Sequence, residues 1–178
     1  MRGKSADLFS LLIILVCMSN SVYSRSDIGT SDEYKIKAAY LYNLIKFIQW
    51  PKDDKLLLVT RVCIIGSNSI LKPFTNLSHR KVKGRPIEIH YQSDSGRLDR
   101  CNMLFIPSDY SNPENLLSLI SSSAILTVGE KPSFLEQGGI VSLIVASNKI
   151  QLHINQSQAK SNGFEISGNL LEVARIVK

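Results

Sequence analysis

The pattern of apolar and polar positions predicts a long first helix between Thr30 and Trp50. Its apolar side chains repeat at helical spacing along one arc, and polar side chains form the opposite stripe. The segment Thr30–Glu33 (TSDE) has the form of a capping box, and Pro51 follows the last predicted residue. Lys37 is the exception because it projects from within the apolar arc. We expect it to snorkel or to meet an acidic partner, a functional role being the alternative.

Shorter apolar segments after this helix predict strands that alternate with helices. Strands are predicted at 56–65, 85–91, 101–106 and 124–128, and helices at 69–77 and from Asn112 onward. Strands at 139–145 and 149–154 are separated by only a few residues, which predicts an antiparallel hairpin. Asn155 caps the next helix, and the last helix turns Leu170, Val173, Ala174 and Val177 inward. This order predicts an α/β fold: a single-domain three-layer sheet, mostly parallel, with an antiparallel C-terminal hairpin at its edge.

The first 24 residues have the form of a signal peptide. Arg2 and Lys4 precede an apolar run from Leu8 to Met18, which is too short for an ordinary transmembrane helix. Val22 and Ser24 stand at the −3 and −1 positions of a signal peptidase site. We therefore expect cleavage near Ser24, an exported protein, and a single domain from residue 25 to residue 178. An uncleaved anchor helix is the alternative.

Composition and charge narrow the class of protein. The 178 residues are 44% hydrophobic and 20% charged, with a formal net charge of +6, as in ordinary globular domains. The densest basic cluster, at 79–85, is interpreted as a solvated loop or as a site of weak attraction to anionic lipid head groups. The latter would place the protein at the periphery of the inner membrane. A nucleic-acid site is disfavoured because no aromatic residues interleave with these charges.

Export leaves Cys63 and Cys101 as the remaining cysteines, since Cys17 departs with the signal peptide. Two cysteines in an oxidising compartment are expected to form a disulfide, and two buried free thiols are the alternative. Neither cysteine has a Cys or His at ligand spacing, so no metal site is predicted.

Catalytic patterns are sparse. The sequence contains no nucleophile elbow, P-loop or dinucleotide fingerprint, and it predicts neither an enzyme nor a cofactor. Gly66, Ser67 and Asn68 follow one predicted strand, and Ser108 and Asp109 follow another. Open α/β sheets bind ligands beyond the ends of such strands, so these residues form a candidate small-molecule site.

The segment Tyr34–Pro51 (YKIKAAYLYNLIKFIQWP) resembles the opening helix of the YfiR-like periplasmic proteins. The resemblance continues, in order, through Val62–Gly66, Val82–Pro86, Cys101–Ile106, Leu126–Gly129, Gly138–Gly139 and Leu170–Val177. It covers nearly all of the chain beyond the signal peptide.

This resemblance implies a regulator rather than an enzyme. YfiR-like proteins are α/β domains that dimerise, and YfiR represses an inner-membrane diguanylate cyclase by binding its periplasmic part. Less cyclic di-GMP is then made, and release of the repressor under redox or envelope stress is associated with biofilm formation. Cys63 and Cys101 match family cysteine positions. Some members carry a second cysteine pair near the Gly-Gly hairpin, which this chain lacks.

Trp50 and Tyr42 are the candidate partner-binding residues, because aromatic side chains often anchor interfaces. The alternative for Trp50 is that its indole folds onto the domain. The alternative function is a periplasmic small-molecule-binding module without a cyclase partner.

Overall fold

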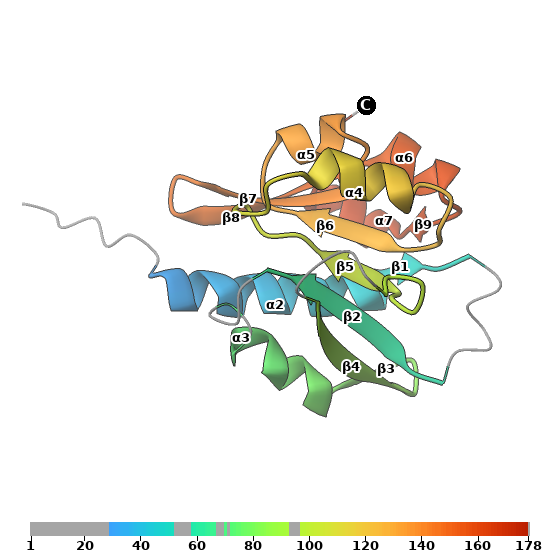
Figure 1. The fold of residues 1–178 in the computed structure, drawn as a ribbon. Helices are drawn as coiled ribbons and strands as arrows, with labels where there is room; N and C mark the ends of the chain where they lie inside the picture. Colours follow the sequence, from blue (N-terminus) through green and yellow to red (C-terminus); the bar gives the residue numbers. More distant parts are fainter. Residues whose placement is uncertain (1–28, 52–57, 67–69, 71, 93–96, 178) are drawn as a thin grey trace, which may run out of the picture.

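The computed structural model describes residues 29–51, 58–66, 70, 72–92 and 97–177. The predicted signal peptide, residues 1–24, lies outside the described residues, as do the candidate ligand-binding residues Ser67 and Asn68. The described elements form an eight-stranded sheet with helices on both faces, together with a separate two-stranded ribbon (Figure 1).

The helices are α2 (Thr30–Phe47), α3 (Lys72–Thr75), α4 (Pro113–Leu119), α5 (Ser133–Glu136), α6 (Gln156–Ser161) and α7 (Gly168–Val173), with a 3-10 turn η3 (Asn76–His79). The ribbon consists of β1 (Ile48–Gln49) and β9 (Glu165–Ile166). The sheet contains β2 (Thr60–Ile65), β3 (Lys81–Val82), β4 (Arg85–Gln92), β5 (Met103–Phe105), β6 (Leu126–Gly129), β7 (Val141–Ala146), β8 (Lys149–Asn155) and β10 (Arg175–Val177).

The strand order in the sheet is β10-β8-β7-β6-β5-β2-β4-β3. Strands β4, β2, β5, β6 and β7 run parallel, whereas β8 is antiparallel to β7 and β3 is antiparallel to β4. This arrangement confirms the predicted α/β class, the mostly parallel sheet and the C-terminal hairpin. From β2 the chain passes first to β4 on one side and then to β5 on the other, so the strand order reverses between β2 and β5.

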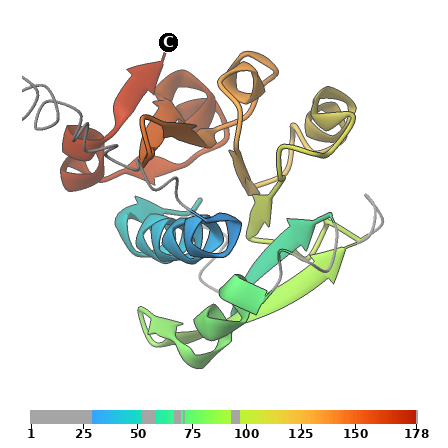
Figure 2. The ribbon, with the colours of Figure 1, turned by 90° about the vertical axis from the view of Figure 1, so that its left-hand side faces the viewer.

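Side-chain alternation along the strands divides the apolar core between the two faces of the sheet. Val62 and Ile64 of β2 belong to the core that contains α2, whereas Cys63 and Ile65 belong to the core that contains α4. Figure 2 looks along α2 and shows the sheet curving around it, with α4 and α5 on the far side. The molecule therefore has three layers.

Helix α2 differs from the prediction at both ends. Its N-cap is Gly29, without a side-chain cap, so the predicted capping box does not form. The Glu33 carboxylate pairs with Lys37 instead of reaching back to the helix start. The helix ends at Phe47 rather than at Trp50, because Ile48 and Gln49 pair with β9.

Two further segments, residues 81–82 and 175–177, are strands that were not predicted. Residues 81–82 form a hairpin with β4, the strand predicted at 85–91, around Lys83 (φ 52°) and Gly84 (φ 81°), which have the backbone of a type I′ turn. At the other edge, residues 175–177 pair with β8 as β10, so the last helix is shorter than predicted. Val173, predicted to face inward, is 71% exposed. Strand β3 pairs with the adjacent strand β4 and β10 pairs with β8, and both are too short to show a periodic pattern of their own.

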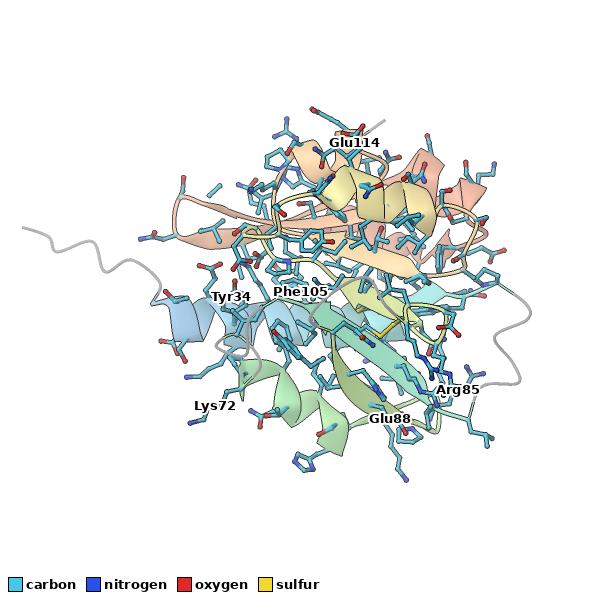
Figure 3. The ribbon with its side chains drawn as sticks, viewed as in Figure 1. Tyr34, Lys72, Arg85, Glu88, Phe105 and Glu114 are labelled. Atoms are coloured by element: carbon cyan, nitrogen blue, oxygen red, sulfur yellow. A yellow bond between two sulfur atoms is a disulfide. The ribbon has the colours of Figure 1, made fainter. Side chains whose placement is uncertain are left out.

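The predicted disulfide between Cys63 and Cys101 is present on the α4 side of the sheet (Figure 3). Its Cα atoms lie 5.8 Å apart, and both cysteines are buried. The bridge joins the middle of β2 to the segment that leads into β5, and so ties together the two strands at the centre of the sheet.

Replacing Cys63 by Ser should lower the free energy of unfolding by about 4 kcal/mol, since the disulfide restricts the unfolded chain. Urea denaturation of the oxidised wild type, the reduced wild type and Cys63→Ser measures this loss. The two forms without the disulfide should unfold at the same lower urea concentration. An unchanged midpoint in both would contradict the prediction.

Because of His153 on β8, we expect the free energy of unfolding to fall in acid. The side chain is buried and lies opposite Arg175 of the edge strand β10, and burial followed by the Arg175 charge lowers its pKa below 6.5. The unfolded chain therefore takes up this proton at a higher pH than the folded protein, and stability falls as the pH drops below about 6.5.

Measuring the free energy of unfolding from about pH 7.5 to about pH 5 tests this linkage. His153→Gln should lose less stability over this range than the wild type. His79→Gln, which removes an exposed histidine, is the matched control and should follow the wild type. Parallel curves for the wild type and His153→Gln would refute the assignment.

Candidate functional site

The carboxyl ends of β2, β5 and β6 meet at one end of the sheet, where the strand order reverses. Gly66 follows β2 with φ 126°, and a Cβ atom at this position would lie 3.0 Å from Cγ of Pro107, which follows β5. The structure thus brings the loop of Gly66 beside the loop of Ser108 and Asp109, as the candidate ligand site requires. Whether a ligand binds there stays a prediction.

A buried lysine from α2 reaches this end of the sheet. The Lys37 side chain is 2% exposed, and its amine pairs with the carboxylates of Glu33 and Glu130. Glu130 directly follows β6 and is itself 3% exposed. Its second oxygen accepts a hydrogen bond from the backbone N–H of Ser108, at 2.6 Å. Glu130 therefore links α2 to the ends of both β5 and β6.

Tyr34 packs over the same charges. The Lys37 amine lies 4.8 Å from the centre of the Tyr34 ring, and the ring contacts Phe74 and Phe105 edge-on (Figure 3). Burial, and then the neighbouring carboxylates of Glu130, Glu33 and Asp109, raise the pKa of Tyr34 far above its ordinary value. The phenol therefore stays protonated at any physiological pH and does not serve as a base.

A cavity of about 580 Å³ beside Tyr34 and Ile70 lies at this end, but the cavity at the Ser108 loop is small. The cavity beside Ser108, Glu130 and Lys131 has a volume of about 160 Å³. Typical ligand pockets are larger, about 300–1,000 Å³. The Ser108 N–H, a donor that an anionic ligand would use, already donates to Glu130. The space suits a few water molecules better than a metabolite.

A larger groove of about 630 Å³ lies at the opposite end of the sheet, where β2 and β4 begin. Its apolar wall includes Ile45 and Trp50, and its polar rim includes Lys83, Arg85 and Glu165. Because α2 runs from one end of the sheet to the other, it supplies both Lys37 at the carboxyl end and the residues leading to Trp50 at the amino end. Figure 3 shows Arg85 far from Tyr34, at the groove end.

The structure separates the two candidate partner-binding residues. The Trp50 indole is half-buried: its Nε1 donates to the carbonyl of Asn102 at 3.3 Å, and its ring meets Phe164 edge-on at 5.9 Å. Tyr42 lies in a different groove, between α2 and η3, where Arg80 lies over its ring at 4.9 Å. That Trp50 and Tyr42 bind a partner, on one surface or on two, stays a prediction.

Sequence reasoning missed Glu130 and the rim of the groove. Lys37 within the apolar arc was a signal that an acidic partner exists, and Glu130 is the acid that directly follows a predicted strand. Lys83 and Arg85 were noted only as part of a basic cluster, because their hairpin was not predicted. Glu165 gave no signal, since β9 is two residues long.

Lys37→Met should lower the free energy of unfolding by about 3–5 kcal/mol, because the Glu130 carboxylate is left buried without its partner. Lys35→Met is the matched control: Lys35 pairs with Asp32, both are exposed, and such pairs contribute less than about 1 kcal/mol. Chemical denaturation measures both. Equal effects of the two substitutions would show that the buried pair does not hold α2.

The described residues offer two negative findings. They include no group of three or more His, Cys, Asp or Glu residues that could hold a metal ion. Nor does any described helix combine the length and the apolar character needed to cross a bilayer.

Comparison with known proteins identifies the family. The model of the YfiR/HmsC-like family matches residues 34–175. No curated protein matches the chain. Two solved structures share the fold, and the chain spans 60% of the length of each.

One is a conserved domain protein from Vibrio cholerae O1 biovar El Tor, with 12% identity over 79% of this chain and a TM-score of 0.58. The other is an ABC domain in complex with L-Trp from Streptococcus pneumoniae, with 14% identity over 79% of this chain and a TM-score of 0.53. At these identities the likeness concerns the fold alone. The chain belongs to the YfiR/HmsC-like family.

Proposed function

We propose that this protein is a non-enzymatic periplasmic regulator that binds the periplasmic domain of an inner-membrane diguanylate cyclase and represses cyclic di-GMP synthesis. Residues 1–24 are its signal peptide, and residues 25–178 form the exported domain. The observation that carries the proposal is the family match over residues 34–175, which spans nearly all of the described elements.

The groove at the amino end of the sheet is the proposed contact surface. An interface of this kind combines an apolar centre with a polar rim. Trp50 supplies the apolar centre, and Lys83, Arg85 and Glu165 supply charges of both signs at the rim. The contacts of Trp50 with Asn102 and Phe164 hold the indole in place, so little side-chain entropy is lost when a partner covers it.

A homodimer is part of the proposal. Strand β10 is at the edge of the sheet, and among the described strands it pairs with β8 alone. Val173 and Ile176, beside this edge, are 71% and 39% exposed. Exposed apolar side chains beside an unpaired strand edge favour association between copies.

The alternative is a small-molecule-binding module without a cyclase partner, with its ligand between Gly66 and the Ser108–Asp109 loop. The position at the reversal of strand order supports it. The small cavity and the engaged Ser108 N–H favour the regulator instead.

Tagged protein should co-purify a membrane diguanylate cyclase from envelope extracts, as identified by mass spectrometry. Trp50→Ala should then weaken binding to the purified periplasmic domain by at least tenfold, as expected for a central aromatic anchor. Isothermal titration calorimetry measures the affinity.

Leu119→Ala is the control, because Leu119 is a 66% exposed apolar residue on α4, on the other face of the sheet. It should bind like the wild type. Because Trp50 also packs on Phe164, the thermal unfolding of each variant is recorded at the binding temperature. A folded Trp50→Ala protein with unchanged affinity would remove Trp50 from the contact, and recovery of no cyclase would contradict the proposed function.

A further inference from the structure

A basic surface at one edge of the sheet extends beyond the groove proposed to contact a cyclase, and it shares Lys83 with the lining of that groove. Arg80 follows η3, Lys81 lies in β3 and Lys83 stands in the turn before β4, and we term these three residues the basic edge. Arg80, Lys81 and Lys83 are exposed. No Asp or Glu occurs between Lys72 and Ile87.

The fold holds these cations in place. Val82 is 6% exposed and anchors the β3–β4 hairpin in the core, so its neighbours Lys81 and Lys83 are turned outward. Lys83 itself stands in the type I′ turn, and Arg80 lies over the Tyr42 ring. Strand β3 ends the sheet on this side, and among the described strands it pairs with β4 alone. The positive charge is therefore displayed on a fixed edge.

The nearest acid on β4 does not cancel this charge. Glu88 lies 3.2 Å from both Arg61 Nε and His90 Nε2, and these contacts, that with His90 first, hold the pKa of its carboxyl below the usual value. The Glu88 carboxylate thus interacts with Arg61 and His90, which are not part of the basic edge.

An exposed apolar side chain accompanies the basic edge. Leu58 is 86% exposed. It stands two residues before Thr60, which is in register with Ile87 of the parallel strand β4. Leu58 is therefore at the same end of the sheet as Arg85 and the β3–β4 turn. Clustered cations beside a protruding apolar residue are the combination with which peripheral proteins bind the interface of an anionic bilayer.

We propose that the basic edge and Leu58 form a docking surface for membranes that contain anionic phospholipids. Lipid head groups are mobile and adapt to a row of exposed cations, whereas nucleic-acid binding would call for stacking aromatic residues, which residues 79–85 lack. Binding to a lipid surface requires no protein partner, so vesicle binding tests this inference separately from the proposed function. In the periplasm it would hold the domain against the inner membrane.

Vesicle sedimentation tests the proposal with residues 25–178 in the oxidised form. The protein should bind vesicles of equal parts phosphatidylcholine and phosphatidylglycerol at low ionic strength, and should not bind phosphatidylcholine alone. Binding should weaken as salt is added, because salt screens exposed charges. Absence of binding to the anionic vesicles at low salt would overturn the proposal.

The variants locate the surface. Lys81→Gln combined with Lys83→Asn, which keeps a residue suited to the left-handed turn, should reduce partitioning roughly 30-fold, the loss expected for two charges near an anionic surface. Leu58→Ser should also reduce it.

Lys149→Gln with Lys160→Gln removes two exposed charges elsewhere and is the matched control. This control should change partitioning less than threefold. An equal loss in the control would show that net charge, rather than this surface, drives binding. If the wild type ignores vesicles but the Lys81/Lys83 variant loses an acidic protein partner, the surface binds protein and the membrane proposal is wrong.

Discussion

The ion pair between Lys37 of α2 and Glu130 after β6 fixes how the long helix lies across the sheet. An apolar helix face alone would tolerate several positions along the strands, but only one lets the lysine reach this carboxylate. Burying both charges is costly unless their remaining hydrogen-bonding groups are satisfied. The Lys37 amine also pairs with Glu33 and lies over the Tyr34 ring, and the Glu130 carboxylate accepts a hydrogen bond from the Ser108 N–H. The pair thus selects one position of α2 on the sheet, in addition to stabilising the fold.

The position of α2 in turn makes the cavities at the two ends of the sheet different. At the carboxyl end, where open α/β sheets commonly bind ligands, Lys37 and Glu130 are buried beside the Ser108 loop, and the cavity at that loop measures about 160 Å³. At the amino end, the ribbon that follows α2 and the β3–β4 hairpin leave a groove of about 630 Å³ with Trp50 at its wall. This groove lies at the same end of the sheet as Lys83 and Leu58. A regulator that meets a membrane partner would present both features on one side of the molecule.

Local periodicity predicted those parts of the fold that depend on neighbouring residues. The long helix, the β7–β8 hairpin with its turn at Ser147 and Asn148, and the Asn112 and Asn155 caps follow from sequence and are present. Strands β3 and β10 were not predicted because two or three residues are too few to show a periodic pattern of apolar positions. Pairing with β4 and with β8, respectively, makes them strands.

The same distinction applies to the site. The sequence predicted that Lys37 snorkels or meets an acidic partner, but not that Glu130, 93 residues further along, is that partner. The rule for parallel strands predicted that Gly66 and Ser108 lie at one end of the sheet, and they do. The sequence could not show that Glu130 is buried there and accepts the Ser108 N–H, because this depends on where α2 docks.

The measurement that tests the central claim most directly is the synthesis of cyclic di-GMP by a co-purified, full-length cyclase reconstituted in liposomes, with this protein added on the periplasmic side. The account predicts that the rate falls with added protein and saturates at a defined stoichiometry. An unchanged rate at concentrations where the two proteins are shown to bind would contradict the assignment as a repressor.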